Sequence, residues 1–178
     1  TPVGLVVLLD SAGVTLGGYG IQTIVAAVLV ALYGVSYILF RKSLFIVFTI
    51  IFSTWLFFAV TGYITQGVLV DTDTFWVYKL LLTGVSYMLL GYYFAQSDKA
   101  PLSGPLNGFG IFFFLTSALY LSGWGTNGSA FWELLFPFLT FAAIFTSTHI
   151  KSKTYLVFGT LYLIIYLFKI TSEYFSQS

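Results

Sequence analysis

The chain has 178 residues, of which 58% are hydrophobic and only 7% are charged, and its net charge is +1. An ordinary soluble domain has roughly 25% charged residues, so this chain has too few polar groups to cover a water-facing surface. The small net charge argues against a nucleic-acid partner, and the absence of cysteine excludes disulfides, thiolate metal sites and cysteine nucleophiles.

Six continuously apolar stretches are long enough to cross the bilayer as helices, which takes roughly 20 residues each. They lack the in–out alternation of barrel strands. In chain order the predicted spans are 21–40, 44–66, 75–96, 106–124, 130–149 and 154–175. Residues 1–19 are a weaker seventh candidate, interrupted by Asp10. The sequence therefore predicts an all-α polytopic transmembrane helical bundle of six to seven spans, a single domain over 1–178 whose partner is the lipid bilayer.

The basic residues between the spans indicate the orientation. All of them fall in alternate loops: Arg41, Lys42, Lys99, Lys151 and Lys153. The positive-inside rule places these loops (41–43, 97–105 and 150–153) in the cytoplasm. The C-terminus is then expected outside.

A short pattern recurs at the ends of the outward-running spans: hydroxyl, any residue, aromatic, any residue, hydroxyl, amide. The copies are Thr61–Gln66, Ser122–Asn127 and Ser172–Gln177, with a fainter one at Gly17–Gln22. The inward-running spans share Gly-Val-Ser-Tyr at 34–37 and 84–87. These matches predict a parallel repeat of two-helix hairpins over 24–66, 75–127 and 134–177. The alternative is that interfacial helix ends favour such residues in any membrane protein.

The repeat also bears on both ends of the chain. The copy at Gly17–Gln22 predicts that residues 1–19 form a preceding span. The last copy stops at Gln177, where earlier copies continue into another helix. We therefore expect the chain to be a fragment of a longer one.

The last span, 158–175, together with the Phe-Trp pairs at 75–76 and 131–132 and the Gly-Trp-Gly turn at 123–125, resembles a group of large, uncharacterised bacterial multispan membrane proteins. The resemblance implies a multi-pass protein of the bacterial inner (plasma) membrane with further spans. It implies no activity.

Ionisable residues within a span are unfavourable and are therefore candidate sites. Lys79, Glu133, Lys169 and Glu173 all map to the outer third of the predicted bundle. One interpretation is an outward-facing polar vestibule that binds an ion or a small zwitterion. The other is a set of snorkelling lysines and structural ion pairs. Because desolvation disfavours an unpaired lysine charge, we expect Glu133 to lie within salt-bridge reach of Lys79 or Lys169.

Two further positions carry weaker hypotheses. Pro137 cannot donate to the carbonyl of Glu133, which predicts a kink, and either a hinge with a cation-coordinating carbonyl or a purely structural bend. Asp10 lies near mid-membrane if residues 1–19 span, where a carboxylate can relay a proton or cation. The alternatives are that this segment is re-entrant or is not inserted.

No catalytic constellation, metal site or cofactor site is predicted, since the single histidine, His149, cannot build one alone. We therefore expect no enzyme. Two functions stay open: transport or binding of a small solute or ion, and a non-catalytic scaffold that binds other membrane subunits or further copies of itself. Transport predicts polar residues along a path; a scaffold predicts a dry aromatic interior.

Overall fold

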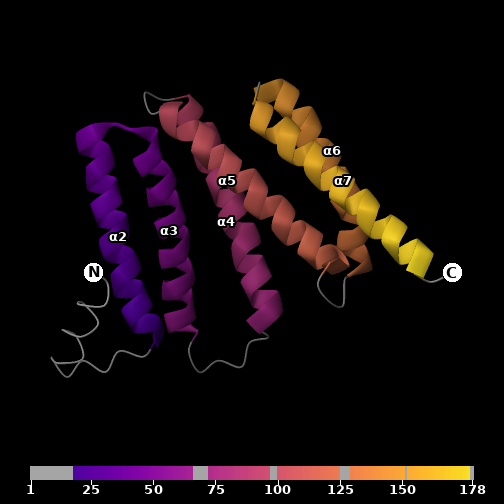
Figure 1. Cartoon of the computed structure of the whole chain (residues 1–178), viewed down its shortest axis with the longest axis horizontal. Coiled ribbons are helices and arrows are strands. Elements are labelled where there is room, and N and C mark those ends of the chain that lie inside the picture. The colour runs from indigo at the N-terminus through magenta and orange to yellow at the C-terminus, as the bar shows by residue number, and fades with distance from the viewer. Residues whose placement is uncertain (1–17, 66–71, 97–99, 125–128, 151, 177–178) are drawn as a thin grey trace. The chain divides into compact units, whose positions relative to one another are not determined.

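The computed structural model describes residues 18–65, 72–96, 100–124, 129–150 and 152–176, and all its regular elements there are helices. In chain order they are α2 (Gly18–Phe40), α3 (Ser43–Ile64), α4 (Thr72–Ala95), α5 (Ala100–Leu119), the π-helical turn η1 (Tyr120–Trp124), α6 (Ala130–Ile150) and α7 (Lys153–Ser176) (Figure 1). Six segments, with η1 completing the α5 span, are long and apolar enough to cross a membrane. The chain is an integral, multi-pass membrane protein.

The helix bounds differ from the predicted spans at two places. The loop predicted over 97–105 extends too far, because α5 begins at Ala100. A proline is compatible with the first helical turn, where amide hydrogens have no partner in the helix, and Pro101 lies there. At the other place, Gly18–Gln22 form the first turn of α2. Residues 1–17, with the predicted seventh span and Asp10, lie outside the described part of the chain.

The chain divides into unit 1 (Thr1–Val70) and unit 2 (Asp71–Ser178). Unit 1 holds the α2–α3 hairpin, whose turn is short because Arg41 adopts a left-handed conformation with φ 49°. In this hairpin the ring of Tyr33 stacks on Phe48 and Phe52, with centroids 5.1 and 5.2 Å away. Aromatic stacking therefore joins the two helices near their connected ends.

In unit 2, α4 and α5 approach each other closely at two glycines. A Cβ atom on Gly84 would lie 2.6 Å from the backbone nitrogen of Phe114, and one on Gly110 would lie 2.8 Å from the backbone nitrogen of Met88. Backbone therefore packs directly on backbone here, as small residues permit in membrane helices. One copy of the Gly-Val-Ser-Tyr pattern, at Gly84, supplies this contact.

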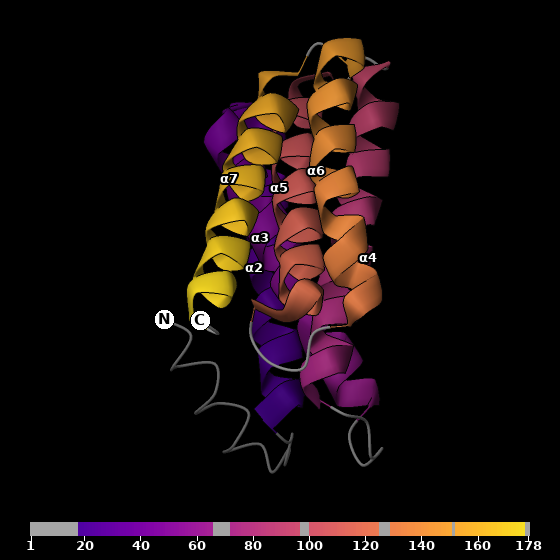
Figure 2. The ribbon, with the colours of Figure 1, turned by 90° about the vertical axis from the view of Figure 1, so that its right-hand side faces the viewer.

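Helix α5 is the centre of unit 2, since it packs against α4, α6 and α7. Figure 2 shows α4, α5, α6 and α7 running side by side. The buried core comes from α5, α6 and α7, and is rich in aromatic side chains: Ile111, Leu115, Ala118, Leu119, Phe136, Ala143, Tyr155, Tyr162 and Tyr166. Helices α6 and α7 meet at Gly159, where a Cβ would lie 2.9 Å from Ile144.

Three polar contacts tie α5 and η1 to α7, and we call them the rungs. The hydroxyl of Tyr155 donates to Oδ1 of Asn107 over 3.1 Å. Farther along, the hydroxyls of Tyr162 and Thr116 are hydrogen-bonded. The third rung runs from Nζ of Lys169 to the carbonyl of Ser122, over 2.6 Å. Because the partner numbers rise together, α5 and α7 run in the same direction.

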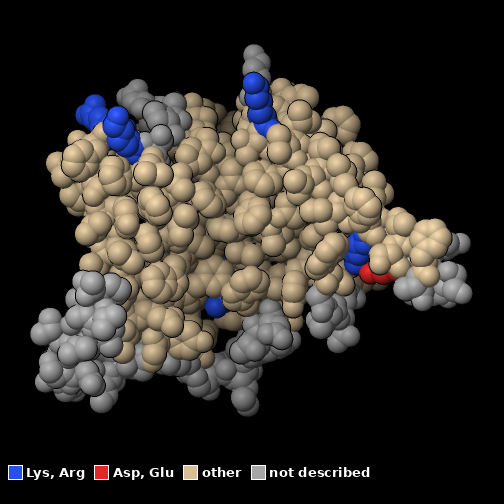
Figure 3. Space-filling model, viewed as in Figure 1, with Lys and Arg blue, Asp and Glu red and all other residues tan. Residues whose placement is uncertain are grey.

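Large apolar side chains cover the outside of the helices; Ile38 and Phe145 are each 72% exposed. The face in Figure 3 is almost entirely uncharged, with lysine, arginine and acidic residues confined to a few spots. Such a surface requires hydrocarbon around it. Consecutive helices also pair as hairpins, α2 with α3, α4 with α5 and α6 with α7. That these hairpins are a true internal repeat stays a prediction.

Several hydroxyl side chains within the spans bond to carbonyls of their own helices. Ser36, Ser117 and Thr140 donate to carbonyls of their own helices. Thr116 does so as well, and additionally reaches Tyr162 on α7. A hydroxyl meets the carbonyl three or four residues earlier without any help from a neighbouring helix, so the local bond is formed first.

Candidate functional site

Lys169 lies at the end of unit 2 where α5 and η1 finish and α6 starts. Its side chain is only 7% exposed. The ammonium group faces three acceptors: the carbonyl of Ser122 at 2.6 Å, Glu173 Oε1 at 3.3 Å and Glu133 Oε1 at 3.6 Å. We call Lys169, Glu133, Glu173 and the Ser122 carbonyl the Lys169 cluster. The Ser122 carbonyl and Glu173 lie within hydrogen-bond distance of the ammonium, and Glu133 is a longer ion-pair contact.

The Ser122 carbonyl is available because the helix ends there. Gly123 has φ 101°, a left-handed conformation that ends η1 and that glycine adopts without a steric penalty. The last carbonyls of a helix have no partner in the helix and carry partial negative charge. Lys169 therefore caps the α5–η1 helix from α7.

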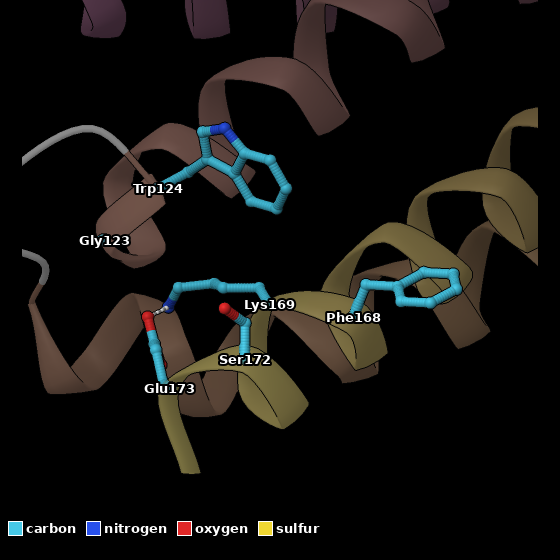
Figure 4. Close-up of a pocket in the computed structure, with 6 residues that line it drawn as sticks. All are labelled: Gly123, Trp124, Phe168, Lys169, Ser172 and Glu173. Carbon is cyan, nitrogen blue, oxygen red and sulfur yellow. Dashed lines mark ion pairs between the residues drawn. The ribbon is translucent and has the colours of Figure 1, made fainter. Parts of the chain in front are cut away.

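Glu133 stands in the first turn of α6, where the helix dipole favours a negative charge. Its carboxylate forms the ion pair with Lys169 that the sequence predicted. Glu173 reaches the same ammonium from the next turn of α7 (Figure 4). Both carboxylates are nearly half exposed, at 46% and 47%, so solvent screens the pairs to about 1 kcal/mol or less each. The bond to the Ser122 carbonyl, worth about 1.5–3 kcal/mol, is the stronger tie.

Pro137 has no amide hydrogen, and the carbonyl of Glu133 is therefore without its usual helical donor. The hydroxyl of Tyr166 on α7 donates to this carbonyl over 2.6 Å. Tyr166 is only 5% exposed, and its ring packs on Phe136 with centroids 5.0 Å apart. A tyrosine of a neighbouring helix thus satisfies the carbonyl that was considered as a cation ligand, which favours the structural reading of Pro137.

Beside the Lys169 cluster the surface is hollowed by about 420 Å³. The hollow is lined by Gly123, Trp124, Phe168, Lys169, Ser172 and Glu173. In Figure 4, Trp124 lies across the hollow from Ser172 and Glu173, and Lys169 extends between them towards the Glu173 carboxylate. The site therefore combines an acidic edge with aromatic walls.

The other residues predicted as sites are not part of the Lys169 cluster, or they lie outside the described part of the chain. Lys79 has its Nζ 4.8 Å from the ring centroid of Phe75 on its own helix. Asp10 belongs to the undescribed segment 1–17. Tyr63 and Trp124 are each about half exposed, and the side chain of Tyr174, the third aromatic of the repeated pattern, lies outside the described residues.

Sequence reasoning missed the Ser122 carbonyl, Tyr166 and the rungs. One signal was present: Tyr155, Tyr162 and Lys169 follow one another at seven-residue spacing, which places them on one face of a helix. Tyrosine is also the residue type that combines an apolar ring with a terminal hydrogen-bonding group. That spacing indicates a polar-tipped seam facing another helix.

Chemically, the arrangement can bind a positively charged group. In the described part of the chain, every buried side-chain nitrogen or oxygen has a hydrogen-bond partner, while the two carboxylates of the Lys169 cluster keep nearly half their surface open. A positively charged group in the hollow would meet Glu173 and the indole of Trp124. Comparison with protein-family models, with curated proteins and with solved structures finds no match.

Proposed function

We propose that this integral membrane protein binds a small solute carrying an ammonium group in the hollow beside Lys169, as the outward-facing entry of a transport pathway. The observation that carries the proposal is the charge imbalance of the Lys169 cluster. Two carboxylates face one buried ammonium. The net negative charge opens towards the hollow, where a cation gains both an ion pair and the face of Trp124.

The ligand is a cation rather than an anion because Lys169 already contacts oxygens of the protein. Its ammonium lies 2.6–3.6 Å from the Ser122 carbonyl, Glu173 and Glu133, so a ligand carboxylate competes with all three. A ligand ammonium shares the Glu173 carboxylate with Lys169, which is possible because a carboxylate has two oxygens that can each accept more than one hydrogen bond. The ammonium end of a zwitterion is attracted to Glu173, but its carboxylate end is repelled by the same acidic site. We therefore expect a zwitterion to bind more weakly than a simple organic cation.

The test uses the protein in lipid nanodiscs and calorimetric titration with tetramethylammonium, methylammonium, glycine and acetate. We expect the two organic cations to bind, glycine to bind more weakly and acetate not at all. Glu173→Gln should weaken cation binding by about threefold to fivefold, the value of one solvent-screened ion pair of about 0.6–1 kcal/mol. Thr171→Ala, an exposed position of the same turn outside the hollow, is the matched control. Cation binding that is unchanged in Glu173→Gln would overturn the assignment.

The side of the membrane belongs to the same proposal. The alternate-loop lysines and Arg41 support a cytoplasmic location for their loops under the positive-inside rule. The Lys169 cluster then faces outward, with the C-terminus outside and the bacterial inner membrane as the location. A site on the outward side binds the solute before the solute crosses the membrane.

A second candidate is a non-catalytic scaffold or assembly subunit, and one observation favours it. Within unit 2 the interior of the described helices is rich in aromatic side chains, and its buried side-chain polar atoms have hydrogen-bond partners within the protein. That is the dry interior expected of a scaffold. If none of the four probes binds while the protein copurifies from native membranes in a defined stoichiometry with other membrane subunits or itself, this second function replaces the first.

A further inference from the structure

We propose that Tyr166 is the positioning residue of Glu133: its hydroxyl fixes the backbone of Glu133 so that the carboxylate faces Lys169. The contact is a 2.6 Å hydrogen bond to the Glu133 carbonyl. The ligand arm of the test rests on the proposed function; the inference about positioning does not.

The need for such a residue follows from Pro137. In an uninterrupted helix, the carbonyl of Glu133 accepts from the amide four residues later, but Pro137 has none. The helical bond at this one carbonyl is therefore missing, while the Glu133 amide still donates to the Ser129 carbonyl over 3.1 Å. Tyr166 supplies the missing donor from outside the helix.

One face of α7 contacts Glu133 at two points. Tyr166 meets its carbonyl, and Lys169, three residues farther along α7, meets its carboxylate over 3.6 Å. Residues three apart lie on the same face of a helix. Two attachments, one to backbone and one to side chain, fix both the place and the direction of Glu133, whereas the ion pair alone leaves a half-exposed glutamate free to turn.

Tyr166 itself is well held. Its side chain is 5% exposed, its ring packs on Phe136 of α6, and the Lys169 ammonium lies 5.9 Å from its ring centroid. A buried ring with a satisfied hydroxyl is a rigid support. Tyr162, about one turn earlier on α7, is equally buried at 6% but hydrogen-bonded to Thr116 of α5, and provides a matched control.

The first arm of the test needs no ligand. Thermal unfolding in nanodiscs is measured for Glu133→Gln in the native, Tyr166→Phe and Tyr162→Phe backgrounds. We expect Glu133→Gln to lower the melting temperature clearly less in the Tyr166→Phe background, because the carboxylate is no longer directed at Lys169. Its effect in the Tyr162→Phe background should match that in the native protein. Equal effects in all three backgrounds would overturn the proposal.

Pro137→Ala provides the rescue, since alanine restores an amide hydrogen that can donate to the Glu133 carbonyl. In the Pro137→Ala background we expect Tyr166→Phe to lose little stability, and the full effect of Glu133→Gln to return. This background also serves if Tyr166→Phe alone fails to fold. A double variant Pro137→Ala/Tyr166→Phe that fails to fold, or that leaves Glu133→Gln without its native effect, contradicts the positioning role.

The second arm measures tetramethylammonium affinity. Tyr166→Phe should weaken binding by about threefold to tenfold, the usual coupling between contacting residues, Pro137→Ala should restore it, and Tyr162→Phe should leave it unchanged. Affinity unchanged in Tyr166→Phe would overturn the link between the placement of Glu133 and cation binding. If the native protein binds no probe while the first arm shows the expected coupling, the proposed function fails and the positioning role stands.

Discussion

Replacing Gly84 by alanine tests whether backbone contact holds α4 to α5. The added Cβ would lie 2.6 Å from the backbone nitrogen of Phe114 and 2.9 Å from the carbonyl oxygen of Gly110. Ordinary van der Waals contact begins near 3.4 Å, so the two helices have to separate by about 0.8 Å. Neither neighbouring atom belongs to a flexible side chain, and the strain is therefore not relieved locally.

The expected loss is the difference between two effects. Overpacking of this kind destabilises by about 1–3 kcal/mol, and the better helix propensity of alanine returns up to about 1 kcal/mol. We therefore expect Gly84→Ala to lower the unfolding free energy by about 1–2 kcal/mol. Gly34 begins the same Gly-Val-Ser-Tyr pattern on α2, but a Cβ there meets nothing within 4 Å. Gly34→Ala should be neutral or slightly stabilising.

The assay is unfolding of the purified protein in mixed micelles, followed by the loss of helical circular dichroism against denaturant or temperature. The two variants share their substitution and their local sequence, so differences in helix propensity cancel between them. A Gly84→Ala protein as stable as Gly34→Ala would refute the reasoning, because the α4–α5 contact would then tolerate a methyl group.

Three further predictions concern the polar contacts and the orientation. Lys169→Met should cost about 1.5–3 kcal/mol in unfolding free energy, because the Ser122 carbonyl loses a charged donor. The control Lys153→Met, at an exposed position, should change it by no more than about 0.5 kcal/mol. A similar melting temperature for both variants would contradict the capping role. Tyr155→Phe should destabilise the protein more than Tyr162→Phe in the same unfolding assay. The first variant removes the donor to the Asn107 side chain, which is 4% exposed, whereas in the second Thr116 keeps its own-helix bond to Phe112. The reverse order would contradict this reasoning. In this cysteine-free chain, single cysteines at 42 and 151 should react with an impermeant reagent only from the cytoplasm and those at 71 and 127 only from outside, and labelling of 151 from outside would overturn the topology.

The spans could be predicted because length and apolar composition alone decide whether a helix crosses a bilayer. The Glu133–Lys169 pair was also within reach, since few acids are embedded and a buried lysine needs one. The role of the Ser122 carbonyl could not be predicted, because every residue has a backbone carbonyl and the sequence does not show which one is free. This one is free because of the turn at Gly123. The free carbonyl above Pro137 was foreseen, yet which residue would satisfy it depends on how α7 packs.

The repeat illustrates a different limit. Gly34 and Gly84 begin identical four-residue patterns, but only Gly84 meets the backbone of another helix within 4 Å. A local pattern specifies the shape of one helix face and carries no information about what is placed against it. Neighbouring hairpins with similar sequences therefore need other features to select their partners.

The rungs between α5 and α7 provide such a feature. Asn107, Thr116 and Ser122 are matched by Tyr155, Tyr162 and Lys169, and each pair is separated by 46 to 48 residues along the chain. Sliding α7 by one turn would break all three contacts together and leave polar groups facing hydrocarbon, which is unfavourable. Apolar surfaces alone tolerate many registers, as coiled coils without a buried polar residue do. The rungs therefore specify one register between two apolar helices, because they fix where along α5 the helix α7 packs.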